Sequence, residues 1–184
     1  MPLGNRVLSG LCANDCCFEL FEPFNTPDMR PLTEKEVIQK LAALCARSEH
    51  CAHEMREKMR RWEVEDTVQE RVITYLQEHQ FIDEERFCRA FVKDKITYNR
   101  WGRRKVEQAL YAKRISPEVQ RRVLDEVDDT DYAEKLRPLL ETKAKSIKVD
   151  NDYERRTKLI RFALSRGFTM DIILDTLSEM GLNR

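Results

Sequence analysis

The chain has 184 residues, of which 41% are hydrophobic, so it can bury the core of one compact domain or of a short array of units. Basic and acidic side chains number 33 each, so the net charge is zero and a basic surface can arise only from where the charges lie. Five glycines and six prolines are too few for an all-β protein, which turns about every ten residues, and no apolar run is long enough to span a membrane, so we expect a soluble helical protein of the cytoplasm.

Residues 1–32 differ in composition from the rest of the chain. They hold three of the six cysteines and four of the six prolines, and few charged side chains. We interpret this segment as a poorly ordered arm, or as upstream sequence included through a wrong choice of start codon, with Met29 as the start. Neither interpretation assigns it a function.

An apolar stripe with helical spacing occurs three times in the remaining chain. The first copy consists of Met55, Met59, Val64, Val68, Val72 and Leu76, and the same internal spacing recurs 51 residues later and again 53 residues after that. In the third copy Thr176 is the one polar member. Repeats of this length are typical of stacked supersecondary units. We therefore predict an all-α, elongated array of three tandem three-helix units, at residues 33–82, 83–129 and 130–184.

Local start signals place three helices in each unit. These signals include a capping box at Thr33–Glu36, a capping Asp83, and a Ser116-Pro117 pair that opens a helix. The expected helices cover about residues 33–47, 53–61 and 65–79 in the first unit, begin after Asp83, Gly102 and Ser116 in the second, and cover about 131–145, 152–165 and 170–180 in the third.

The turn between the second and third helices of each unit carries a further signal. The third copy has Gly167 there, which suits a left-handed helix end, whereas the equivalent residues of the earlier copies are Glu63 and Arg114. A left-handed backbone at either residue would cost about 1 kcal/mol. The alternative is that those two turns have another conformation.

Three stretches of the chain resemble the RecX family, bacterial regulators of the RecA recombinase. They are residues 47–59 (RSEHCAHEMREKM), 81–91 (FIDEERFCRAF) and 102–116 (GRRKVEQALYAKRIS). With the triple repeat, the similarity covers about residues 33–181. The sequence departs from the family pattern at Gln80, where glycine is common, and at Cys51, where serine is usual.

The resemblance implies a specific role. Proteins of this family are not enzymes and need no cofactor; they bind the RecA filament on single-stranded DNA along its helical groove. There they limit filament growth, ATPase, strand exchange and co-protease activity. The expected partners are therefore RecA and single-stranded DNA, and we expect a monomer with no membrane association.

Independently of the family, charge is sorted along the chain. Residues 93–122 hold ten basic and three acidic side chains, a local net of +7, whereas residues 123–134 hold six acidic and no basic ones. A basic stretch of this kind attracts phosphate backbones through counterion release. The alternative is that these cations form a solvated helix face and are neutralised by the acidic residues 123–134 that follow them.

The start of the helix after Gly102 indicates where an anion would bind. If Trp101 packs as a hydrophobic staple and Gly102 caps, three cations at 103–105 fill the first turn, where they oppose the helix dipole. A phosphate bound to the free N–H groups would turn that cost into a gain. The expected RecA or DNA contacts are Lys93, Lys95, Arg100, Arg103, Arg104 and Lys105, with Lys113 and Arg114 secondary.

Two aromatic residues lie among these bases. Tyr98 and Trp101 are candidates for stacking on the bases of a single strand, although a place in the core is the favoured interpretation for Trp101. No other chemistry is predicted. Cys45, His50, Cys51 and His53 lack a convincing zinc-ligand set, and His50 is better explained as closing a turn. Because that ligand set is incomplete, we expect no metal site. No phosphate-binding glycine loop and no nucleophile motif occur, so we also expect no catalytic residues.

Two other functional classes stay open at this point. A helix-turn-helix transcription regulator would need a base-reading recognition helix and a dimer interface. A helical protein scaffold without nucleic acid would bind its partner with little dependence on salt.

Overall fold

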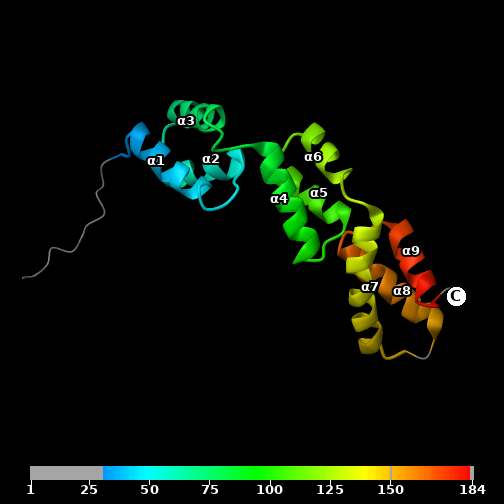
Figure 1. Ribbon diagram of the computed structural model, residues 1–184. Coiled ribbons are helices and arrows are strands. Elements are labelled where there is room, and N and C mark those ends of the chain that lie inside the picture. Colours follow the sequence, from blue (N-terminus) through cyan, green and yellow to red (C-terminus); the bar gives the residue numbers. More distant parts are fainter. Residues whose placement is uncertain (1–30, 150, 183–184) are drawn as a thin grey trace, which may run out of the picture. The chain divides into compact units, whose positions relative to one another are not determined.

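The computed structural model describes residues 31–149 and 151–182, and all regular structure in this part of the chain is helical. It comprises nine helices in three consecutive groups (Figure 1), which confirms the predicted all-α fold of three tandem three-helix units. The helices are α1 (Glu34–Cys45), α2 (Ala52–Arg61) and α3 (Asp66–Glu78), then α4 (Glu84–Thr97), α5 (Arg103–Ala112) and α6 (Pro117–Leu124), then α7 (Asp129–Ser146), α8 (Asp152–Ser165) and α9 (Met170–Glu179).

The described helices do not test every prediction made from the sequence. The predicted arm and the alternative start at Met29 fall on residues 1–30, outside the described part of the chain. The unit boundaries at 33, 83 and 130 stay a prediction, and α7 begins one residue before the last of them, at Asp129. None of the helices in 31–149 and 151–182 combines the length and the apolar character that crossing a bilayer requires.

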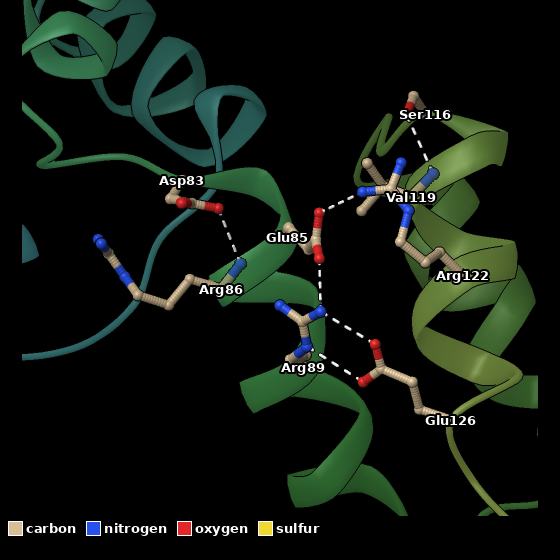
Figure 2. Close-up of polar contacts among 8 residues, drawn as sticks. All are labelled: Asp83, Glu85, Arg86, Arg89, Ser116, Val119, Arg122 and Glu126. Atoms are coloured by element: carbon tan, nitrogen blue, oxygen red, sulfur yellow. Dashed lines mark hydrogen bonds and ion pairs between the residues drawn. The ribbon is translucent and has the colours of Figure 1, made fainter.

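The helix starts follow from local capping. The Glu36 N–H donates to Thr33 Oγ1 at 3.4 Å and the Thr33 N–H donates back to the Glu36 carboxylate at 2.9 Å, which completes the predicted capping box of α1. In Figure 2, the carboxylate of Asp83 accepts from the Arg86 N–H in the first turn of α4, and the hydroxyl of Ser116 accepts from the Val119 N–H of α6. All three predicted caps are therefore confirmed.

The buried apolar side chains of the described residues form two clusters. A first core joins α1, α2 and α3, and its fully buried members include Leu41, Met55 and Leu76. A second core runs through α4 to α9 without interruption and also takes in Cys51, from the start of α2. The second and third units therefore share one core, because neither three-helix unit buries enough apolar surface alone.

The turn between the second and third helices has a left-handed residue in all three units. The backbone φ is 56° at Glu63, 57° at Arg114 and 87° at Gly167. At each turn the next residue donates its N–H to a carbonyl five residues earlier, as Val64 does to Met59 at 3.0 Å. The three copies thus use the same turn, and the alternative of different conformations is wrong. Gln80, where the family often has glycine, is also left-handed, with φ 59°.

We expect glycine to stabilise the two turns that lack it. Glu63→Gly and Arg114→Gly should each raise the free energy of unfolding by roughly 0.5–1 kcal/mol in urea titrations, because both side chains are exposed and the left-handed backbone no longer clashes with Cβ. The matched control, Gln108→Gly on the exposed side of α5, should lose about 1 kcal/mol. Destabilisation at both turns would contradict the conformation described here.

Two buried polar side chains repeat with the units. Gln69 and Gln120 each turn the side-chain amide inward, and it donates to the carbonyl just after the left-handed turn, Val64 O at 2.7 Å and Ile115 O at 2.8 Å. These two glutamines were not predicted to be buried, although the 51-residue shift of the repeat relates their positions. Thr176 takes its expected buried position because its hydroxyl donates to Ile172 O at 2.7 Å.

Candidate functional site

The start of α5 lies against the turn between α8 and α9. Gly102 is the N-cap residue, as predicted, but its N–H donates to Arg166 O at 2.9 Å, and the Arg104 N–H donates to Gly167 O at 3.0 Å. A Cβ built on Gly102 would lie 2.2 Å from the Phe168 nitrogen. The expectation that an outside anion meets these free N–H groups is therefore wrong, because two of the donors are already satisfied by the third unit.

Arg103 is also occupied by the chain itself. Its Nε donates to Glu107 at 3.0 Å, and its terminal nitrogens donate to the Asp125 carboxylate at 2.5 Å and to Leu124 O at 3.3 Å. Its side chain is only 28% exposed. The prediction that this guanidinium is free to bind an anion is wrong, because it joins α5 to the end of α6. Its charge is neutralised within the chain, as the alternative interpretation of the basic stretch predicted.

Figure 2 shows ion pairs that join α4 to α6 and to the residue Glu126 that follows α6. Glu85 lies between the guanidinium groups of Arg89 and Arg122, with a nitrogen–oxygen distance of 2.5 Å to each. Arg89 also donates to both carboxylate oxygens of Glu126, at 2.9 and 3.1 Å. Part of the basic stretch and part of the acidic stretch are thus held in one α4–α6 network. The net positive charge of residues 93–122 and the net negative charge of residues 123–134 are therefore partly neutralised by ion pairs within the chain.

Three of the predicted lysines lie over aromatic rings instead. The Lys95 ammonium is 4.9 Å from the ring centroid of Phe91 and 5.8 Å from that of Trp101, and the Lys105 ammonium is 4.7 Å from Trp101. The Lys113 ammonium is 5.7 Å from Phe91 and 5.9 Å from Phe87. We call these six residues the cation–aromatic surface, although Phe87 itself is buried and Phe91 and Trp101 are partly buried: Phe87, Phe91, Lys95, Trp101, Lys105 and Lys113.

Four of these six residues are predicted from the sequence, and the two phenylalanines are not. A signal was present, because Phe87, Phe91 and Lys95 follow one another at four-residue spacing and so share a face of α4. Trp101 is partly buried and packs against the second core, which agrees with the interpretation favoured for it. Ammonium groups over ring faces are attracted by the ring quadrupole. Lys113 also pairs with Glu54 and Lys95 with its neighbour Asp94, whereas Lys105 forms no ion pair with another described residue.

The remaining predicted contacts are exposed. Tyr98 is 79% exposed. Among the described residues, four predicted bases are exposed and form no ion pair: Lys93, Arg100, Arg104 and Arg114. Their role as contacts stays a prediction.

A polar junction connects the first unit to the second. Glu54 of α2 forms an ion pair with Lys113 at the end of α5, and His50 Nδ1 lies 2.8 Å from the same carboxylate. Ser48 Oγ is 3.0 Å from His50 Nε2, so His50 closes the turn before α2 as expected. The Cys51 thiol donates to Lys113 O at 3.9 Å. In the described part of the chain, no three His, Cys, Asp or Glu side chains are placed to hold a metal ion.

Acid should weaken this junction. Burial favours the neutral form of Glu54, but hydrogen bonds from Lys113 and His50 outweigh it and lower the pKa of Glu54 below its ordinary 4.5. The stability that the ionised group contributes is present above that ordinary value and is lost as the pH falls through the lowered pKa. We expect Glu54→Gln to cost about 1–2 kcal/mol of unfolding free energy at pH 7 and much less at pH 3.

Denaturant titrations across that pH range measure the difference. Glu57→Gln is the matched control, because Glu57 lies three residues along α2 and pairs only with the exposed Arg60. It should change stability little at any pH. A cost of Glu54→Gln that does not depend on pH would contradict the junction.

Comparison with known proteins identifies the family. Three family models, described as the first, second and third three-helix domains of RecX, match residues 43–76, 83–124 and 129–177. The chain belongs to the RecX family. The predicted resemblance is thereby confirmed, and the three matches fall on the three helix groups.

Several RecX proteins are similar in sequence. "Regulatory protein RecX" of Clostridium botulinum (strain Eklund 17B / Type B) is 32% identical over 111 residues, which cover 59% of this chain and 51% of that protein. The Vibrio parahaemolyticus protein of the same name is 29% identical over 135 residues, covering 73% of this chain and 85% of that one. The matched region spans about half the length of the clostridial relatives.

Solved structures show the same fold. A crystal structure of RecX from Lactobacillus salivarius matches with a TM-score of 0.73 and 19% identity, over 81% of this chain and 97% of that one. A second crystal structure, of a regulatory protein RecX, matches with a TM-score of 0.73 and 14% identity, over 79% and 73% of the two chains. These likenesses support the fold alone.

Proposed function

We propose that this RecX-family chain regulates the RecA recombinase. It binds the RecA filament on single-stranded DNA along the filament groove and limits filament growth, ATPase, strand exchange and co-protease activity. It acts as a monomeric binding protein in the cytoplasm, without a catalytic site or a cofactor. Family membership supports the partner, and the cation–aromatic surface is the observation that supports its mode of binding.

The cation–aromatic surface suits a protein–DNA filament for two reasons. Lys95 and Lys105 share the ring of Trp101, so two positive charges are held close together on a rigid base rather than on two flexible stems. Neighbouring exposed cations, Lys93 and Arg104, add to the same basic segment. Such a surface attracts phosphate groups and steers binding to a polyanion.

The decisive experiment is the ATPase of RecA on single-stranded DNA with and without the full chain. We expect inhibition that deepens with the concentration of the chain and that requires filament to be present. Sequence-dependent binding to duplex DNA without RecA would instead favour a helix-turn-helix regulator. An unchanged ATPase at saturating chain would refute the proposed function.

A further inference from the structure

A hollow lies where the first unit meets the second. It has a volume of about 380 Å³, and its walls come mainly from α2, with Lys113 contributed by the end of α5. The side chains that matter for its charge are His53, Glu54, Glu57, Lys58, Arg61 and Lys113. None of them belongs to the contacts predicted from the sequence except Lys113.

The positive charges of this hollow are in excess. Both carboxylates are already paired, Glu57 with Arg60 and Glu54 with Lys113 and His50. Lys58 and Arg61 form no ion pair with any other described residue. Their place in the last turn of α2 suits the helix dipole. That accounts for their sign, but not for a concave surface in which two unpaired cations lie beside the ion pair of Lys113 with Glu54.

The hollow continues into the cation–aromatic surface through shared residues. Lys113 lines the hollow and lies over Phe91, Lys95 lies over Phe91 and Trp101, and Lys105 lies over Trp101. Each step along this path is a contact between neighbouring side chains. Positive charge and ring surface therefore alternate from the last turn of α2 to the first turn of α5.

We propose that the hollow binds phosphate groups of a single nucleic-acid strand whose path continues along the cation–aromatic surface. Lys58 and Arg61 of the first unit thus contribute to the same interface as the second unit. The occupant is a single strand because the proposed function brings this chain to single-stranded DNA, and the cations suit its phosphates. The rings of Phe91 and Trp101 hold the lysines in place rather than stacking on bases. This inference rests on the proposed function and extends it to a part of the chain that lies outside the basic segment.

The test measures binding of a fluorescently labelled oligothymidylate to the full chain by anisotropy at increasing salt. We expect the variant carrying Lys58→Gln and Arg61→Gln to bind about tenfold more weakly at low salt. The slope of log affinity against log salt should fall by about 1.4, since each lost phosphate contact on a single strand contributes about 0.7. Both residues are at the end of a helix, where glutamine is well tolerated, and urea titration verifies folding.

A matched variant removes two cations elsewhere. Lys145→Gln with Lys148→Gln changes the net charge equally, at exposed residues at and just after the end of α7. Its affinity and its slope should equal those of the wild type. Wild-type-like binding by the Lys58/Arg61 variant, or failure of the wild type to bind the oligonucleotide at low salt, would overturn the inference.

RecA ATPase, measured in parallel, separates this inference from the proposed function. If the wild type inhibits RecA while the Lys58/Arg61 variant binds the oligonucleotide normally, the inference fails and the proposed function stands. If that variant keeps its oligonucleotide binding but loses inhibition, the hollow contacts protein and the inference fails as well. An inactive wild type refutes the proposed function whatever the oligonucleotide shows.

Discussion

Gly102→Ala should lower the free energy of unfolding by about 3 kcal/mol, which corresponds to a fall in melting temperature of roughly 6–12 °C for a chain of this size. The added methyl would lie 2.2–2.4 Å from backbone atoms of Gly167 and Phe168, which no side-chain rotation can relieve. The third unit must move away from α5, and the hydrogen bonds from Gly102 and Arg104 to the α8–α9 turn lengthen. Each such bond contributes about 1 kcal/mol.

Other glycines of the chain provide the controls. Gly102 has φ −79° and ψ 164°, which any residue adopts, so its substitution tests the clash without backbone strain. Gly181 has φ 75° and open space around its Cβ position, so Gly181→Ala tests strain without a clash and should cost about 1 kcal/mol. Gly167→Ala combines both effects and should be the most damaging. A Gly102→Ala variant no less stable than Gly181→Ala would contradict the contact between the units.

Charge reversal at Lys95 and Lys105 should weaken inhibition of RecA by at least about tenfold. If Lys95 and Lys105 contact phosphates as proposed, the reversal replaces two attractive charges by two that repel the filament. Lys95→Glu loses the ion pair with Asp94 and the contacts with Phe91 and Trp101, so urea titration verifies that the variant folds. A glutamate in place of Lys105, in the first turn of α5, interacts favourably with the helix dipole. The readout is the concentration of Lys95→Glu/Lys105→Glu protein that halves the ATPase, compared with the wild type.

The matched reversal uses Lys145→Glu with Lys148→Glu, which changes the net charge equally and should leave inhibition unchanged. Since cations in the first turn of α5 oppose the helix dipole, the sequence alone would also favour reversing Arg103 and Arg104, with no loss of stability. The structure changes that expectation for Arg103, because a glutamate there would lie beside Glu107 and Asp125 and lose three hydrogen bonds. Equal inhibition by the Lys95/Lys105 variant and the wild type would exclude the cation–aromatic surface as the contact.

Helix periodicity and capping could be derived from sequence because they are local. The apolar spacing that recurs after 51 and 53 residues locates the inward face of the second and third helices of each unit, and Thr33, Asp83 and Ser116 each cap a residue three positions away. The family resemblance follows from the same segments. For these features, the nearest neighbours in the chain are also the interaction partners.

Less of the candidate site than of the fold could be predicted from the sequence. Its lysines and Trp101 were found, because the basic segment is visible in the order of the charges along the chain. Their grouping over Phe87 and Phe91 was not, since it depends on how the faces of α4 and α5 meet. Lys58 and Arg61 were missed because they lie in the first unit, outside the basic segment, and join the others only through Lys113.

Gly167 and Arg103 show the physical reason for this division. The amino-acid pattern accounts for a left-handed turn at Gly167, but the same turn forms at Glu63 and Arg114 without glycine. Glycine is required in the third copy because a Cβ there would lie 2.4 Å from Lys105 Cβ, across more than sixty residues of chain. Likewise the charge of Arg103 is evident from sequence, whereas its neutralisation by Asp125 depends on the packing of α5 against the end of α6. Local spacing encodes which residues are buried or charged, and the approach of distant segments decides which partners they meet.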